Sequence, residues 1–190
     1  PTLDKMPLKQ AEFGQYERPF DTLELFYCGV AATGSPFQKE QYHISSVIQL
    51  KNVPSVTQLR EVWKGLRHQH PQIAAISDET SSRLIYTVPS PETLEEWLQM
   101  TFVVHDNETR SAESLDAVLP QSSLFMLHYL PRSRELFFRT PHWRIDGTGM
   151  ILLQHDFLTL LARGPQSTLE FDGSEVSRIP PSLDEAAGIS

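Results

Sequence analysis

The sequence predicts an α/β protein in which a mixed β-sheet is flanked by helices. Three patterns indicate this class: helices that begin at capping residues, short strands rich in β-branched and aromatic residues, and the alternation of the two along the chain. Of the 190 residues, 39% are hydrophobic and 21% are charged, which is enough apolar material for a sizeable core. We therefore expect one good-sized domain or two small lobes.

The first third of the chain predicts an arm, two strands and a helix. Residues 1–19 are polar and interrupted by prolines, which is typical of an arm, whereas residues 20–33 carry enough apolar side chains to form a core strand. Residues 41–50 are β-branched and predict a strand that ends near Leu50. The clearest helix follows Pro54, because Ser55 and Gln58 make a capping-box pair ahead of apolar residues at helical spacing.

Proline placement and periodicity define the remaining elements. Pro71 should end the first helix, and Pro91 suits the first position of a second one, which Ser90 starts. A third helix should run from Thr148 to about Gly164. Between these helices we expect short strands over 72–76, 82–88 and 101–106, a loop over 107–117, and a hairpin of 123–131 with 134–142.

Composition argues against several function classes. The net charge is −8, from 16 basic and 24 acidic side chains, and no clustered basic face that would suit nucleic acid is visible. The single cysteine, Cys28, permits no intrachain disulfide and fits a reducing compartment. No apolar run approaches the roughly 20 residues that span a bilayer. A cytoplasmic protein without nucleic-acid or membrane partners is the expectation.

The stretch FRTPHWRIDGTGM, residues 138–150, carries the clearest chemical pattern. Alternation along a strand places Phe138, Thr140 and His142 on one face, with His142 at the strand's end and at the edge of the core. A neutral imidazole there could take a proton from an alcohol or an amine. A histidine that merely ends a strand explains the position equally well.

Asp146 precedes the third helix, where aspartate is a favoured N-cap and complements the helix dipole, so its position alone favours a structural role. Gly147 and Gly149 would let the backbone turn sharply there. Arg144 either braces Asp146 or points to solvent. Trp143 either lines a pocket or packs beneath the hairpin, and packing is the preferred interpretation.

Metal chemistry is not expected. The chain has no H-E-x-x-H, C-x-x-C, G-x-S-x-G or P-loop motif. His68 and His70 lie near a helix end, and the adjacent pairs His105–Asp106 and His155–Asp156 have no third ligand in the sequence pattern.

The segment HWRIDG, after a hydrophobic strand and before an apolar helix, resembles the H-x-x-x-D-G motif of the chloramphenicol acetyltransferase-like superfamily. This group includes BAHD-type acyltransferases, fungal CoA-dependent O-acyltransferases and the condensation domains of peptide synthetases. The segments LREVWKGLRHQHP and QIAAI are similar to the early helix and strand of these enzymes. RIPPSLDEAAGI resembles the crossover that leaves the first lobe in fungal O-acyltransferases of the trichothecene type. The resemblance covers the chain from about Phe20 onward.

The resemblance implies a role for each motif residue. His142 would be the general base that deprotonates a small-molecule alcohol or amine, which then attacks an acyl thioester such as acyl-CoA. Asp146 would mainly hold the loop, often through an arginine, and Gly147 would be the close-packing glycine of the motif. Pro141 stands where condensation domains have a second histidine, which favours a stand-alone acyltransferase. Acyl-CoA would be a co-substrate rather than a tightly bound cofactor, and no residue is assigned to its binding.

The expected organisation is an arm over 1–19, an N-terminal acyltransferase lobe over 20–165, and a crossover over 166–190 that leads towards a missing second lobe. That lobe would come from the same polypeptide or from another chain, because two-lobed members need more than twice the material after the motif. The alternatives are a same-fold cyclase or isomerase, a condensation-like partner of a carrier protein, or a non-catalytic binding module. The sequence does not specify the acceptor, the acyl chain length or the oligomeric state.

Overall fold

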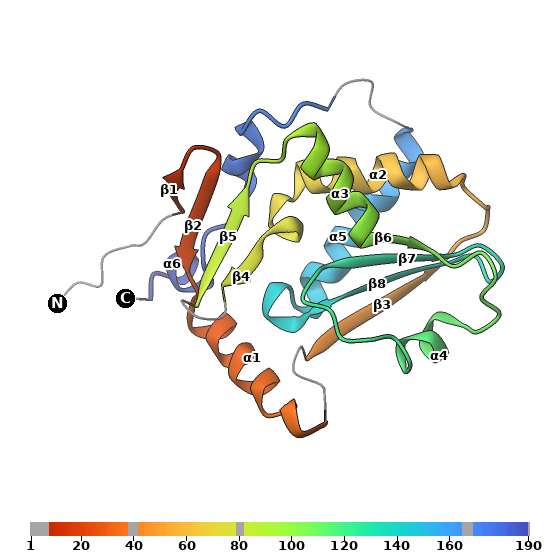
Figure 1. The fold of residues 1–190 in the computed structure, drawn as a ribbon, viewed down its shortest axis with the longest axis horizontal. Coiled ribbons are helices and arrows are strands. Elements are labelled where there is room, and N and C mark those ends of the chain that lie inside the picture. The colour runs from red at the N-terminus through yellow and green to blue at the C-terminus, as the bar shows by residue number, and fades with distance from the viewer. Residues whose placement is uncertain (1–7, 38–41, 79–81, 165–168, 190) are drawn as a thin grey trace.

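The strands of the described residues form two four-stranded sheets. The computed structural model describes residues 8–37, 42–78, 82–164 and 169–189 (Figure 1). The first sheet is antiparallel and has the order β1 (Lys9–Glu12), β2 (Gln15–Pro19), β5 (Arg83–Thr87), β4 (Ile76–Asp78). The second has the order β3 (His43–Gln49), β8 (Glu135–Pro141), β7 (Met126–Leu130), β6 (Phe102–Val104). This second sheet is mixed, since β6 pairs with β7 in parallel and the other pairs are antiparallel.

The main core lies between the second sheet and three helices that cover one of its faces (Figure 1). These helices are α2 (Val56–Gln69), α3 (Pro91–Thr101) and α5 (Gly147–Arg163). Trp63 of α2 is fully buried, stacks on Trp97 of α3 at 5.5 Å between ring centroids, and donates its indole N–H to Thr101 at 3.0 Å. The short helix α4 (Ala112–Asp116) packs on the other face through Ala112 and Leu115. The predicted α/β class is therefore confirmed.

Strand β8 is the element that carries the chain to the motif. It lies between β3 and β7, and its residues from Leu136 to Pro141 are all buried. The expected hairpin is confirmed, with Arg134 at φ +56° in the turn that joins β7 to β8. Because β8 is hydrogen-bonded on both sides, the position at which it ends, just before His142, is fixed by seven register pairs with β3.

A second, smaller core joins the first sheet to the start of the chain and to its C-terminal part. It contains Phe20, Leu84, Tyr86 and Trp143, with Val176 and other half-buried residues packed against it. The C-terminal part forms a 3₁₀ turn (Ser174–Arg178) and the short helix α6 (Leu183–Ala187). No helix in the described ranges is long and apolar enough to cross a membrane.

Two expectations for the start of the chain are wrong. Residues 20–33 were expected to hold a strand but contain helix α1 (Thr22–Ala32), because Asp21 and Glu24 form a complete capping box that starts a helix. Residues 9–19 form the hairpin β1–β2, which extends the first sheet, where an arm was expected. Residues 1–7 of that expected arm lie outside the described residues.

Three further expectations need correction. Residues Pro71–Ala74 form a 3₁₀ turn, so the strand expected over 72–76 begins only at Ile76. The loop expected over 107–117 contains α4, which Ser111 caps. Ser55 caps α2 as predicted, because its Oγ accepts the N–H of Gln58 at 3.1 Å, but the reciprocal bond of a capping box is not seen in the described structure. The other predicted helices and strands are present with bounds shifted by a few residues.

Candidate active site

A cavity of about 190 Å³ lies beside the motif, and both His142 and Asp146 line it. Its remaining walls come from α1, from the 3₁₀ turn His142–Arg144, and from the C-terminal segment 179–183. The walls therefore combine segments from the beginning, the middle and the end of the chain. The structure thus places the two principal motif residues at one hollow in the surface.

His142 lies directly after the last residue of β8 and is half-buried. Its backbone N–H donates to the carbonyl oxygen of Tyr42 at 2.9 Å. The imidazole stacks on the phenol ring of Tyr27 with 4.1 Å between centroids and 19° between planes, and it is nearly parallel to Tyr42 at 5.4 Å. Its Nδ1 is buried and has no hydrogen-bond partner among the described residues. Ring stacking therefore holds an imidazole whose Nδ1 is not engaged by the described part of the chain.

Asp146 is the N-cap of α5. Its backbone is extended, with φ −93° and ψ −179°, and its Oδ1 accepts the N–H of Gly149 at 2.7 Å. The carboxylate also stands where the partial positive charge of the helix terminus favours an anion. The structural role that its position predicts is thus observed.

The close-packed glycine at the start of α5 is Gly149, not Gly147. A Cβ on Gly149 would lie 2.8 Å from Cγ1 of Ile145 and 3.2 Å from Oδ1 of Asp146, and such contacts force a shift. A Cβ on Gly147 would meet nothing within 4 Å among the described residues, and its φ is not in the left-handed range. Within the described residues, Gly149 is thus the glycine that packs closely, against Ile145, and the role that the resemblance gives to Gly147 stays a prediction.

Arg144 fits neither of its two sequence interpretations. Its guanidinium donates to the backbone carbonyls of Gln72 at 3.3 Å, of Ser123 at 2.9 Å, and of Ala75, and no bond joins it to Asp146 in the described structure. It thus ties the motif turn to the segment before β4 and to the loop before β7. Burial lowers the pKa of this guanidinium below its usual value.

Trp143 lines the cavity and is also packed, but its packing partners are in the core of the first sheet, where packing beneath the hairpin was expected. The side chain is 8% exposed and packs on Phe20 with 5.1 Å between ring centroids, which is the packing role. It also lines the cavity beside His142. The Arg144 guanidinium lies over the Trp143 ring at 4.5 Å.

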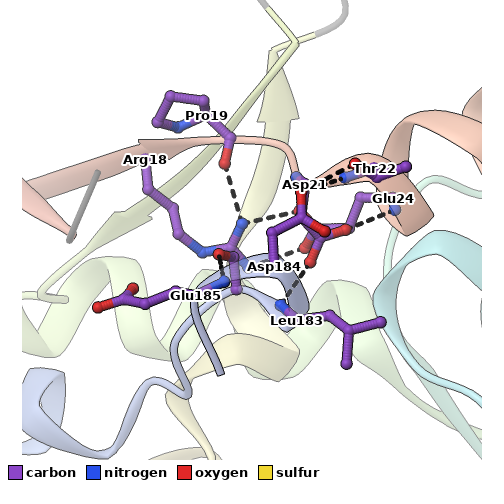
Figure 2. Close-up of polar contacts among 9 residues, drawn as sticks. Arg18, Pro19, Asp21, Thr22, Glu24, Leu183, Asp184 and Glu185 are labelled. Atoms are coloured by element: carbon purple, nitrogen blue, oxygen red, sulfur yellow. Dashed lines mark hydrogen bonds and ion pairs between the residues drawn. The ribbon is translucent and has the colours of Figure 1, made fainter. Parts of the chain in front are cut away.

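A network of charged groups joins one wall of the cavity to α6 (Figure 2). Arg18 makes two hydrogen bonds, of 2.7 and 2.8 Å, to the two carboxylate oxygens of Glu24. Burial alone would lower the pKa of Arg18, but the bonds to Glu24 outweigh burial and the pKa lies above its usual value. Asp21 caps α1 and also accepts the N–H of Leu183 at 2.7 Å. Since Arg18 is already paired with Glu24, its charge serves the architecture of this wall.

Other histidines are paired but do not form a metal site. Nε2 of His105 lies 2.9 Å from Nδ1 of His128. Nε2 of His70 lies 2.8 Å from Oδ2 of Asp156. Across the ranges that the structure describes, no three histidine, cysteine, aspartate or glutamate side chains gather where they could hold a metal ion.

Sequence patterns did not identify the aromatic and charged residues around His142. The strand expected over 20–33 contains Tyr27, Asp21 and Glu24. In the structure, helix α1 and its N-cap place these three residues on the wall of the cavity that His142 also lines. The D-x-x-E spacing of Asp21 and Glu24 is the signal that identifies this helix. Tyr42 has a φ of +43°, and the neighbouring sequence does not predict this left-handed conformation.

Comparison with known proteins finds relatives among fungal acetyltransferases. The chain is 33% identical over 190 residues to the acetyltransferase pigO of Monascus ruber, covering 95% of this chain and 40% of that protein. It is 30% identical over 188 residues to the O-acetyltransferase pigM of the same organism, covering 96% of this chain and 36% of the relative. The chain therefore spans less than half the length of these relatives. No family model matches it.

Among solved structures, the chain is similar to the TRI3 trichothecene 15-O-acetyltransferase from Fusarium sporotrichioides. The TM-score is 0.67 at 16% sequence identity, and the match covers 94% of this chain and 43% of that one. At this level of identity the match concerns the fold. The fold of this chain thus corresponds to less than half of a larger enzyme.

Proposed function

Because the chain is a lobe of the chloramphenicol acetyltransferase-like fold, similar in sequence to fungal acetyltransferases, we propose that it supplies the general base of an acyl-CoA-dependent O-acyltransferase. The acceptor is a small hydroxylated secondary metabolite. The observation that carries the proposal is the half-buried His142 imidazole, which lines the cavity next to the N-cap Asp146. A neutral imidazole on the wall of a cavity can accept a proton from a hydroxyl group that is bound there.

The proposed reaction moves one proton and one acyl group. His142 takes the proton of the acceptor hydroxyl while the hydroxyl oxygen attacks the carbonyl carbon of the thioester. The carbon–sulfur bond then breaks, and the imidazolium returns the proton to the departing CoA thiolate. Asp146 holds the start of α5 and so fixes the turn that follows His142. It takes no part in the proton transfer.

Completion of the site by a second lobe is part of the proposal. The relatives are more than twice as long as the matched region, and the cavity beside His142 is only about 190 Å³. We propose that further polypeptide, from the same or another chain, supplies the acyl-donor side. A cytoplasmic location is proposed with it, and the presence of a single cysteine among these 190 residues fits a reducing compartment.

The test is acyl transfer by the complete protein with His142 replaced. His142→Ala should lower the rate of acylation of a panel of alcohols by acetyl-CoA by about 10²- to 10⁴-fold, followed by product mass and by release of free CoA thiol. His155→Ala is the matched control, because His155 is an exposed histidine on α5. Near-normal turnover by His142→Ala would contradict the general-base assignment.

The same incubation separates the alternatives. A product heavier by one acyl group, with stoichiometric release of thiol, supports acyl transfer. A product of unchanged mass but altered retention would instead support a cyclase or isomerase. If a small molecule binds but neither a new product nor free CoA thiol is detected, a non-catalytic module is favoured.

A further inference from the structure

Tyr27 makes the closest ring contact with the motif histidine. Its centroid lies 4.1 Å from that of His142, and the two planes differ by 19°, so the rings overlap face to face. Tyr42 is more distant at 5.4 Å. A stacked neighbour at 4.1 Å restricts rotation of the imidazole about its χ2 bond, because the rotated ring would collide with the phenol.

Helix α1 presents Tyr27 in a fixed direction. The side chain is half-buried and packs against the core cluster that contains Phe20 and Trp143. The preceding residue, Phe26, is 61% exposed and meets Tyr27 only edge-on at 5.5 Å. The helix therefore directs Tyr27 inward, onto His142, and leaves the preceding aromatic residue, Phe26, exposed.

The N-terminus of α1 is held from two sides. Asp21 and Glu24 complete a capping box, and Glu24 is also bound by Arg18. From the C-terminal segment, Asp184 accepts both the N–H and the hydroxyl of Thr22, at 3.0 and 2.9 Å (Figure 2). Because the helix is anchored at its start, Tyr27, one turn further along, keeps its place over the imidazole.

The stacked phenol also has an electrostatic effect on the base. The face of an aromatic ring carries negative charge, which attracts a cation placed over it. During general-base catalysis the imidazole becomes an imidazolium, so the Tyr27 ring favours the form that appears as the proton is taken up. This attraction is worth about 0.5–1 kcal/mol at exposed sites and more when the pair is desolvated.

We propose that Tyr27 is a positioning residue for His142, which fixes the plane of the imidazole and stabilises the imidazolium that forms during acyl transfer. This inference rests on the proposed function of His142 as the base. Tyr27 itself neither exchanges a proton nor contacts the acyl group. Its effect comes from the ring and not from the hydroxyl.

The decisive comparison is between Tyr27→Leu and Tyr27→Phe. Loss of the ring in the Leu variant should lower kcat about tenfold with a smaller change in KM, and the acidic limb of the pH–rate profile should move to lower pH. The Phe variant keeps the ring and should stay within about twofold of the parent protein. Leu25→Ala is the matched control, because Leu25 lies on the same helix and is 46% exposed.

A second measurement does not depend on turnover. In protein labelled with ¹³C-histidine, the ring protons of His142, assigned with His142→Asn, should resonate upfield because they lie over the Tyr27 face. Tyr27→Leu should move them downfield, whereas Tyr27→Phe should leave them in place. If Tyr27→Leu does not fold, Tyr27→Met removes the ring while keeping a longer apolar side chain.

The outcomes separate the two proposals. If His142→Ala abolishes acyl transfer but the Leu and Phe variants have the same kcat and the same pH profile, Tyr27 is not a positioning residue. Unchanged His142 resonances in the Leu variant would overturn the stacking itself. If His142→Ala retains turnover, the general base lies elsewhere and the catalytic role of Tyr27 fails with it, whatever the spectra show of the stacking.

Discussion

The carboxylate of Asp184 accepts the backbone N–H of Thr22 at 3.0 Å, although 162 positions separate the two residues in sequence (Figure 2). Thr22 is the first residue of α1, and Asp184 belongs to α6. The relation is reciprocal, since Asp21 accepts the N–H of Leu183, the first residue of α6, at 2.7 Å. Each helix thus supplies a carboxylate to the free N–H groups and the positive end of the other.

Replacing Asp184 with Ala should loosen α1 from the C-terminal segment. Two hydrogen bonds to Thr22 disappear, so the free energy of unfolding should fall by about 1 kcal/mol, measured by urea denaturation. The Asn variant retains an acceptor oxygen and should recover most of the loss. Equal stabilities of the Ala variant and the parent would show that these exposed bonds contribute nothing.

Within the C-terminal segment, substitution of Glu175 should lower the stability of the protein most. It is completely buried and accepts the hydroxyl of Tyr86 at 2.8 Å and the N–H of Gly173 at 3.0 Å. Burial, together with the hydrogen bond to Glu175, raises the pKa of the Tyr86 phenol, so this bond is made by a neutral hydroxyl.

Glu175→Ala leaves both donors without that acceptor and should cost about 2–4 kcal/mol, measured by chemical denaturation. Glu175→Gln keeps the shape and one acceptor and should cost less. Glu170→Ala is the control, because Glu170 is an exposed glutamate a few residues earlier. A loss for Glu175→Ala no larger than that for Glu170→Ala would contradict the role assigned to the buried carboxylate.

The two motif glycines should respond differently to alanine. Gly149→Ala places a methyl group 2.8 Å from Ile145 and should lower the free energy of unfolding by about 1–3 kcal/mol. Gly147→Ala introduces no such contact in the lobe and should stay within about 0.5 kcal/mol of the parent. Thermal denaturation of the two variants side by side checks this, and an equal loss in both would be the contrary result.

The buried histidine pair predicts a loss of stability in acid. Burial lowers the pKa of His128 to about 3, and repulsion from His105 and Arg139 adds to the effect; burial also lowers the pKa of His105. The unfolded chain therefore binds protons below about pH 6.5 that the folded protein does not, so stability is full above that pH and falls below it.

For His128 alone, the free energy of unfolding should be lower by about 1.4 kcal/mol at pH 5.5 than at a pH well above 6.5. His128→Phe removes the buried titratable ring and keeps an aromatic partner for Phe137, which stacks on His128 at 5.4 Å. Urea denaturation at pH 7.5 and 5.5 should show a smaller pH dependence in this variant than in His155→Ala. The same pH dependence in both would mean that His128 is not the group responsible.

Much of the fold around the motif follows from local sequence rules. The hairpin β7–β8 and helix α5 were predicted because their periodicity, turn residues and cap all indicate the same structure. Asp146 was predicted as a cap because its carboxylate needs only the N–H of a residue three positions away. Interactions between residues that are only a few positions apart can be predicted from the sequence alone.

The surroundings of His142 were not predictable in this way. Tyr27 reaches it across more than a hundred residues, and only the tertiary packing of α1 against the motif turn decides that contact. The partners of Arg144 are backbone carbonyls of segments that become neighbours only in the folded protein. No pairwise spacing encodes such contacts, so the sequence shows these residue types but not the roles that tertiary packing gives them.

The segment Ile179–Pro180–Pro181 gives the cavity one rigid side. It lines the cavity together with the motif, and it is held at one end by Glu175 and at the other by Leu183 and Asp184. Two successive prolines have fixed φ angles and no N–H, so this wall neither bends easily nor offers amide donors. The apolar outline of the cavity on this side is therefore set by covalent structure, and substitution of Ile179 would change the shape of the cavity while leaving every residue of the motif in place.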